Sequence, residues 1–250
     1  MNMSVKIPNA VKYFNHIEKL KQDCFTFIKG TDIQAMLDCT EHDIQEFSNQ
    51  WNLLELDHYM GDGGLYRYRR YGQLTKLATG QGLTLLPYAS YVQSKEVNYL
   101  NGDVERKYEP LTTEFSQSPV LLQVLSMVSS LYDKVDGKTN DWNIRLHPYR
   151  IVATGEQIGK PAPEGLHRDG VTFIASMMIN RHNVSGGVTT LTDADRQPKA
   201  TAELTNPFDI VIADDARTMH DVSPVEVLDN DTLGTRDVLV IAFTKLEQVA

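Results

Sequence analysis

The sequence is poor in features that mark several large classes of protein. It has only two cysteines, Cys24 and Cys39, in no metal-binding spacing and too few for a disulfide framework, so we expect two reduced thiols. No run approaches the roughly 20 apolar residues of a membrane span. The first residues lack the apolar segment of a signal peptide. We therefore expect a cytoplasmic protein with no membrane partner.

Basic residues are also scarce relative to acidic ones. The 250 residues include 24 Lys and Arg against 33 Asp and Glu, a formal net charge of −9. Nucleic acids bind basic surfaces that release counterions, so we expect no nucleic-acid partner. Hydrophobic residues make up 41% of the chain, enough for a sizeable core, and no Gly/Ser/Pro-rich linker divides it. We expect a single domain over residues 1–250, while the oligomeric state stays open.

The order of periodic segments predicts the fold class. Apolar residues at helical spacing predict helices over 8–21, 31–48 and 118–134. A helical and mixed part over about 1–140 is followed by a β core over about 141–246. We predict a mostly β protein with flanking helices (α+β), a sandwich or barrel with the helices packed on one sheet. The expected core strands are 143–154, 171–180, 187–192, 208–214, 222–228 and 236–244.

A metal site is predicted from three residues of the β core. His167 and Asp169 are separated by one residue, so a strand would present both on one face. His220 follows another apolar strand and is the best candidate for a third ligand. Two imidazoles and one carboxylate occupy one face of an octahedral ion and leave the other face open, as in non-haem Fe(II) oxygenases. The His-x-Asp pair alone is a weak signal, and the conjunction with His220 strengthens it.

An arginine opens the last apolar strand. Arg236 precedes the run 238–243, and a buried guanidinium needs an anion to compensate it. Its planar fork matches the far carboxylate of 2-oxoglutarate with two parallel hydrogen bonds. The alternative is an ion pair with Asp237 or another local acid. Thr218 and Thr172 are candidates for an additional hydroxyl at the cosubstrate, or are ordinary strand residues.

The order His167-x-Asp169, His220, Arg236 resembles the Fe(II)/2-oxoglutarate-dependent dioxygenases. That family has a double-stranded β-helix core, related to jelly rolls and cupins. Further segments resemble its branch of bacterial hydroxylases that act on free L-amino acids: 67–71, 93–99, 146–150 and 236–239. The resemblance covers the chain from about residue 60 onward. It implies Fe(II), 2-oxoglutarate and dioxygen as cofactor and cosubstrates, and hydroxylation of an unactivated C–H bond with conversion of 2-oxoglutarate to succinate and CO2.

An amino-acid substrate needs a cation for its carboxylate and acceptors for its ammonium group. Arg67 and Arg69 alternate in the chain, and one of them can clamp the carboxylate. The alternative is a solvated strand edge. Arg150 and His147 match family positions, and His147 is expected to be structural rather than a fourth ligand. The candidates beside the ammonium group are Gln93, Glu96 and Asn98.

Two other functions stay open at this point. One keeps the iron chemistry but acts on another small metabolite or a carrier-bound amino acid. The other is a non-redox, cupin-like protein that binds a metal or a ligand. Arg236 favours the enzymes, since a simple metal binder has no need of a buried cation near its ion.

Overall fold

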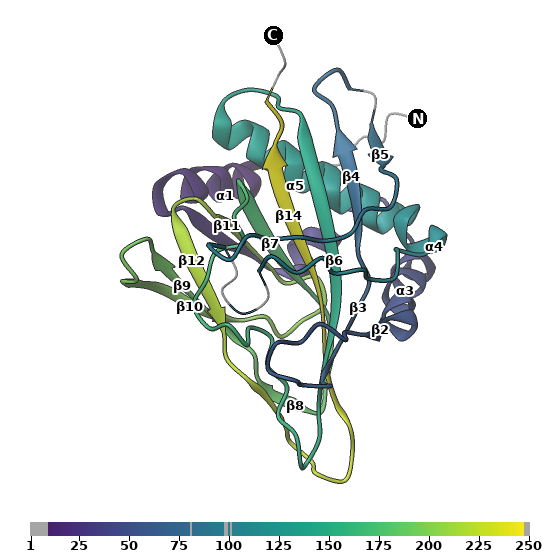
Figure 1. Ribbon diagram of the computed structural model, residues 1–250. Helices are drawn as coiled ribbons and strands as arrows, with labels where there is room; N and C mark the ends of the chain where they lie inside the picture. Colours follow the sequence, from purple (N-terminus) through teal and green to yellow (C-terminus); the bar gives the residue numbers. More distant parts are fainter. Residues whose placement is uncertain (1–9, 81, 98–99, 101, 248–250) are drawn as a thin grey trace.

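Two β-sheets face each other, and helices cover the outer side of the larger one (Figure 1). The computed structural model describes residues 10–80, 82–97, 100 and 102–247. Within them, no helix is long and apolar enough to cross a membrane. The mostly β architecture with flanking helices confirms the predicted fold class.

The helices come mainly from the first half of the chain. They are α1 (Ala10–Asp23), α2 (Gly30–Gln34), α3 (Glu41–Asn49), α4 (Thr113–Ser116) and α5 (Pro119–Asp136), with a short 3-10 helix at Gln50–Leu53. Helix α5 begins with a proline at its first position, where the missing N–H costs nothing, and ends at Gly137 in the left-handed conformation. The predicted helix over 31–48 is wrong as one element: Thr40 and Asp43 form a capping box that starts a new helix.

The larger sheet runs in the order β1-β11-β7-β14-β6-β3-β2, with β4 on β6 and β5 on β4. The smaller sheet has the order β10-β9-β12, and β13 pairs with β8. The strands of the first half of the chain are β1 (Phe25–Ile28), β2 (Glu55–Leu56), β3 (Arg67–Arg69), β4 (Gly72–Lys76) and β5 (Leu83–Leu85). Those of the second half are β6 (Trp142–Ala153), β7 (Phe173–His182), β8 (Val184–Gly186), β9 (Val188–Asp193), β10 (Pro198–Glu203), β11 (Ile210–Asp214), β12 (Thr218–Val222), β13 (Val225–Val227) and β14 (Gly234–Lys245).

Strand β14 shows how the sheet separates a core from a cavity. Successive side chains of a strand point to opposite faces. One set packs in the core beneath the helices: Leu239, Ile241 and Phe243. The other set lines a cavity between the two sheets: Arg236, Val238, Val240 and Ala242. Burying each large apolar side chain of the first set contributes about 1.5–3 kcal/mol, which holds the cavity-facing set in register.

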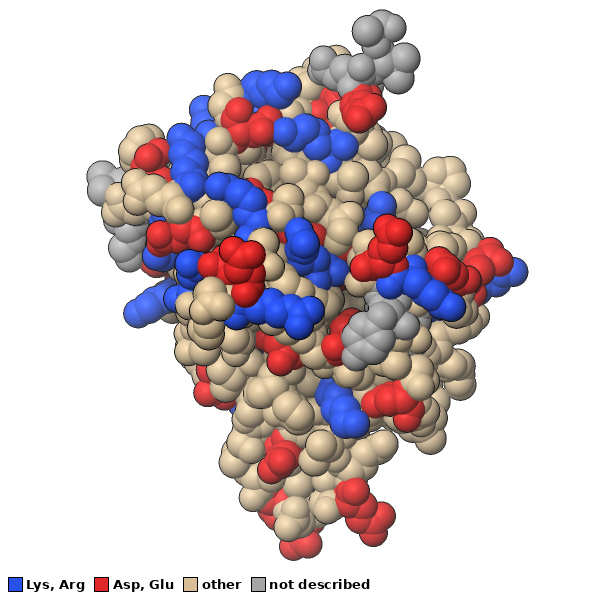
Figure 2. Space-filling model, turned by 60° about the vertical axis from the view of Figure 1, so that its left-hand side comes forward, with Lys and Arg blue, Asp and Glu red and all other residues tan. Residues whose placement is uncertain are grey.

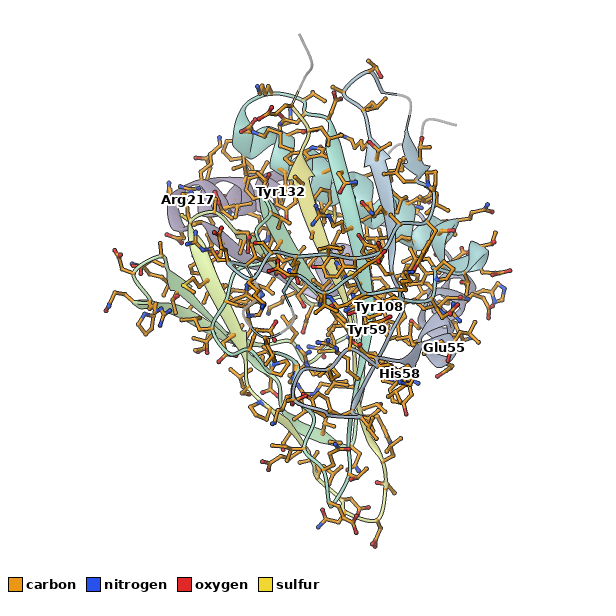
Figure 3. All side chains as sticks on the ribbon, viewed as in Figure 1. Glu55, His58, Tyr59, Tyr108, Tyr132 and Arg217 are labelled. Carbon is orange, nitrogen blue, oxygen red and sulfur yellow. The ribbon has the colours of Figure 1, made fainter. Side chains whose placement is uncertain are left out.

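The helical layer closes the outer face of the sheet through aromatic contacts. Tyr132 of α5 stacks on Phe173 of β7, with ring centroids 4.2 Å apart, and lies between helix and sheet (Figure 3). The indole N–H of Trp51 donates to the carbonyl of Tyr149 at 3.0 Å. These contacts confirm the expectation that the helices pack against one sheet of the core.

The six predicted core strands correspond to β6, β7, β9, β11, β13 and β14. The predicted strands do not include β1, β2, β4, β5, β8, β10 or β12, and His220, predicted to lie beside a strand, lies within β12. Strand β1 was missed because its apolar run is only four residues long. The expected strand around His167 and Asp169 is also wrong. Both belong to the loop over 154–172, and only His167 makes a strand-like bridge.

The surface carries charges of both signs. On the face in Figure 2, basic side chains across the upper part are interspersed with acidic ones, and acidic side chains gather at the lower tip. The whole chain has a net charge of −9. On this face the basic side chains form no uninterrupted patch.

Candidate active site

The three predicted ligands come together at one end of the cavity. His167, Asp169 and His220 place their ligand atoms within 4.8 Å of one another. The backbones of His167 and His220 form an antiparallel bridge, with distances of 3.0 and 2.9 Å between the donor nitrogen and the acceptor oxygen. His167 Nδ1 contacts the carbonyl oxygen of Gly165 at 2.7 Å. This contact suits a protonated Nδ1, which leaves the lone pair on Nε2 for a metal.

Burial and neighbouring charge prepare these groups for a cation. Burial, together with the charge of His167, lowers the pKa of His220 to about 3, so its imidazole is neutral at neutral pH. Burial also lowers the pKa of His167, but the carboxylates of Asp169 and Glu164 outweigh it, and the net shift is upward. Burial raises the pKa of Asp169. A bound metal ion supplies the positive charge that keeps such a carboxylate ionised.

Asp215 holds the segment that carries Asp169. The residue is 1% exposed, and its two carboxylate oxygens accept hydrogen bonds from the backbone N–H groups of Asp169 and Val171, at 3.0 and 2.9 Å. A loop residue can therefore present its carboxylate as firmly as a strand residue would. No sequence pattern marks this role, because Asp215 follows β11 and meets its partners only through folding.

The cavity extends from the metal ligands between the two sheets. Its walls come from β6, β7, β11 and β14 on one side and from β9 and β12 on the other. Apolar side chains make up much of the lining, among them Ile174, Leu191, Val211, Val238 and Val240. A cavity with so many apolar side chains, beside the triad, suits chemistry that must exclude solvent.

Arg236 lies in this cavity and forms no ion pair with a described residue. The residue is 1% exposed, and its Nε and Nη2 atoms have no hydrogen-bond partner among the described residues. Burial and the nearby Arg181 lower its pKa to about 10, against the opposing effect of Glu203. It is still a cation at neutral pH. The alternative of an ion pair with Asp237 is wrong, since Asp237 binds Arg150 at 2.7 Å.

The two guanidinium nitrogens of Arg236 that lack a described partner can donate hydrogen bonds to the far carboxylate of 2-oxoglutarate. The residues present therefore suit both groups: the triad would hold Fe(II), and Arg236 would hold the cosubstrate. Thr218 does not contribute as predicted. It is absent from the cavity lining, and its hydroxyl donates to the Asp214 carbonyl at 2.7 Å. The hydroxyl of Thr172 likewise binds the backbone, because it accepts a hydrogen bond from the N–H of Lys245.

A second arginine lines the cavity. Arg67 is 7% exposed, and its Nε and Nη2 both contact one carboxylate oxygen of Asp57, at 2.8 and 2.7 Å. These contacts use two of its five N–H groups, and the others make no hydrogen bond to a described residue, so they can donate to a ligand. Asp57 Oδ2 also lies 3.8 Å from Arg69 Nη1, so one carboxylate faces two guanidinium groups. This cluster retains an excess positive charge beside the cavity.

Arg69 stands behind Arg67 and outside the cavity lining. Its guanidinium lies 3.7 Å from the ring centre of Tyr108, and Tyr59 packs edge-on against Tyr108 (Figure 3). Its Nη2 also contacts Nδ1 of His147. Burial and Arg69 lower the pKa of His147 well below its ordinary value, so His147 stays neutral and accepts. Of the two candidate clamps, the structure places only Arg67 at the cavity.

The remaining substrate candidates lie elsewhere or outside the described residues. Gln93 accepts from Arg106 at 2.9 Å and is absent from the cavity lining. Glu96 is exposed, in a groove on the outer side of the His167 segment. Arg150 is wrong as a substrate residue, because it points away from the cavity and forms a bidentate pair with Asp237. Asn98 is outside the described residues.

Sequence reasoning missed several polar side chains of the cavity. Ser176 and Thr189 bring hydroxyl groups from the two opposing sheets, and Tyr91, Tyr149 and Glu164 also line it. The alternation of side chains along a strand predicts two of them. Tyr149 lies two residues after His147 on β6, and Ser176 lies two residues after Ile174 on β7, so both members of each pair point to the cavity face. Tyr91 and Glu164 belong to loops, where no such pattern applies.

Comparison with known proteins agrees with this geometry. A model of the 2OG-Fe dioxygenase family matches residues 48–242. The chain belongs to this family of oxidoreductases, which use Fe(II), 2-oxoglutarate and dioxygen. The prediction of the family and of its cofactors is thereby confirmed.

Individual relatives narrow the comparison. The chain is 27% identical to the 3(1)-hydroxy-L-isoleucine 4-dioxygenase of Pantoea ananatis (strain AJ13355), over 95% of this chain and 97% of that one. It is 25% identical to the L-isoleucine-4-hydroxylase of Bacillus thuringiensis, over 77% and 82%. Among solved structures, a bsmA homologue from Methylobium petroleophilum PM1 superimposes with a TM-score of 0.85 at 29% identity, covering 97% of each chain.

Proposed function

We propose that this protein hydroxylates an unactivated C–H bond of a free L-amino acid while 2-oxoglutarate is converted to succinate and CO2. The observation that carries the proposal is the presence of two arginines, Arg236 and Arg67, on one cavity that also contains the triad. The two organic substrates of such a reaction each bring a carboxylate. Each arginine would bind one of them.

The two arginines differ in a way that assigns them. The Nε and Nη2 atoms of Arg236 have no partner in the part of the chain that the structure describes, and the apolar residues Val238 and Val240 line the cavity from the same strand, β14. This arrangement suits a dicarboxylate cosubstrate that binds in the cavity. Arg67 is held by Asp57 and keeps part of its donor edge, which suits a fixed clamp for the carboxylate of a smaller substrate. The names of the two relatives, both acting on isoleucine or its hydroxylated form, support an amino-acid substrate.

In this proposal His167, Asp169 and His220 hold Fe(II), which supplies the oxidising chemistry with dioxygen and 2-oxoglutarate when bound. The apolar wall, including Ile174, Leu191 and Val211, orients the aliphatic part of the amino acid. The same wall excludes water, which protects the oxidant from side reactions.

The test is turnover by the purified protein with Fe(II), ascorbate and 2-oxoglutarate, with each of the twenty L-amino acids in turn, followed by succinate formation. At least one amino acid should raise succinate clearly above the rate without substrate. If none does, amino-acid hydroxylation is wrong. If another small metabolite or a carrier-bound amino acid stimulates succinate formation instead, the enzyme acts on that class of substrate.

A further inference from the structure

We propose that Glu164 binds the ammonium group of the amino-acid substrate and so makes the enzyme specific for a free, unacylated α-amino group. This inference rests on the proposed function and names the recognition device of the same site. It replaces the earlier candidates Gln93 and Glu96, which the structure places outside the cavity.

Glu164 is placed where a substrate would meet both the metal and Arg67. It belongs to the loop over 154–172, and its side chain lines the cavity with 12% exposure. One of its carboxylate oxygens lies 3.6 Å from Nε2 of His167, the nitrogen that faces a metal. A group bound to Glu164 is therefore next to the metal centre. Hydrogen abstraction requires the target carbon to be held at such a position.

Arg67 and Glu164 provide opposite charges at the same cavity. Asp57, Arg67 and Arg69 together carry one excess positive charge, and Glu164 carries one negative charge. Burial lowers the pKa of Arg67, but Tyr149, Asp57, Tyr108 and, last among these, Glu164 raise it, and the net shift is upward. The two charges thus act within range of each other. A zwitterion can place its carboxylate on Arg67 and its ammonium group on Glu164.

Other carboxylates near the triad do not fit this role. Asp169 is a predicted metal ligand, and Asp215 is bound to the backbone of Asp169 and Val171. Glu96 lies in the groove on the outer side of the His167 segment, together with Arg168. Among the described residues that line the cavity, Glu164 and Asp169 are its two acidic side chains, and only Glu164 is outside the triad.

The arrangement has a consequence for specificity. An α-hydroxy acid keeps the carboxylate but offers Glu164 a neutral hydroxyl, and an N-acyl amino acid offers an uncharged amide. In both cases the carboxylate of Glu164 exchanges a charge-assisted hydrogen bond for a weaker, neutral contact, or for none. Free α-amino acids should therefore be preferred over both analogues of the same side chain.

The experiment compares the wild type with Glu164→Gln on three compounds: the best amino-acid substrate, its α-hydroxy analogue and its N-acetyl derivative. Loss of a buried, charge-assisted hydrogen bond should raise KM for the amino acid about 10- to 100-fold. The preference for the amino acid over its α-hydroxy analogue should collapse by a similar factor. Affinity for 2-oxoglutarate, measured anaerobically with the iron-loaded protein, should stay within about twofold of the wild type.

Two further variants keep the test decisive. Glu164→Asp retains the charge and should keep most of the preference, which also covers the case that Glu164→Gln folds poorly. Glu96→Gln removes a carboxylate from the outer groove and should behave as the wild type. If both Glu164 variants discriminate between the three compounds as the wild type does, Glu164 is not the ammonium site although amino-acid hydroxylation stands. If no amino acid is a substrate of the wild type, both proposals fail together.

Discussion

His167 and His220 donate backbone hydrogen bonds to each other's carbonyl oxygens, and their rings lie with centroids 4.4 Å apart. The spacing of two proposed metal ligands is therefore set by a main-chain bridge between a loop and β12, independent of any ion. A site organised in this way is preformed, so iron binding need not order the segment first.

Alanine substitution of His167, Asp169 or His220 should remove iron binding and turnover. Changes to residues that merely orient metal ligands already cost 10- to 100-fold, so loss of a ligand should reduce activity by more than about 100-fold. Iron content after anaerobic reconstitution measures the effect. His182→Ala is the matched control, because His182 is exposed at the end of β7. A variant that keeps full iron content would remove its residue from the triad.

Asp215→Asn should weaken iron binding without removing a ligand. The asparagine side chain has one acceptor oxygen for the two N–H groups of Asp169 and Val171, and its amide would face one of them donor to donor. We expect about 10-fold weaker iron affinity and about 1–3 kcal/mol lower free energy of unfolding. Asp221→Asn, in β12 beside His220, is the comparison. Unchanged iron affinity in Asp215→Asn would show that the loop holds its shape without this carboxylate.

Arg236→Lys should raise KM for 2-oxoglutarate about 10- to 100-fold, with a smaller effect on the amino acid. Lysine keeps the charge but cannot form two parallel hydrogen bonds to a carboxylate. Arg150→Lys is a matched control: Arg150 pairs with Asp237 outside the cavity, so the KM for 2-oxoglutarate should not change. Equal 2-oxoglutarate affinity in both variants would make Arg236 a structural residue.

Gly187→Ala tests the placement of Arg236 without altering Arg236 itself. A Cβ at Gly187 would lie 2.7 Å from Nε of Arg236, so the guanidinium must move. KM for 2-oxoglutarate should rise about 10-fold or more. Gly80→Ala is the control, because both glycines have φ near +75° (+72° and +80°) but a Cβ at Gly80 meets no described atom within 4 Å. Both variants carry a similar backbone strain of about 1–2 kcal/mol, so only a difference between them reports on Arg236.

The sequence predicted those parts of the site that local pattern and chain order define. The triad and Arg236 follow from residue type and from their positions at strand-like segments, and the structure brings them to one cavity. The alternation of side chains along β6 would also have excluded Arg150 from the cavity. His147, Tyr149 and Ile151 share the cavity face, so Arg150 must point to the other side.

Other parts depend on contacts that sequence spacing does not encode. Asp57 pairs with Arg67 through a turn that closes β2 on β3, and Asp215 reaches Asp169 across 46 residues. Glu164 lies in a loop with no periodicity, so nothing in the sequence marks it as facing the cavity. The break in the predicted helix over 31–48 could have been predicted from the sequence, since Thr40-x-x-Asp43 is a pattern that caps the start of a helix.

The most direct test of the central claim is a reaction under ¹⁸O-labelled dioxygen with the amino acid that stimulates succinate formation most. If one cavity couples 2-oxoglutarate oxidation to hydroxylation, mass spectrometry should find one labelled oxygen in succinate and one in the hydroxylated amino acid, with the two products in nearly equal amounts. Succinate that accumulates while every amino acid is recovered unchanged would contradict the claim.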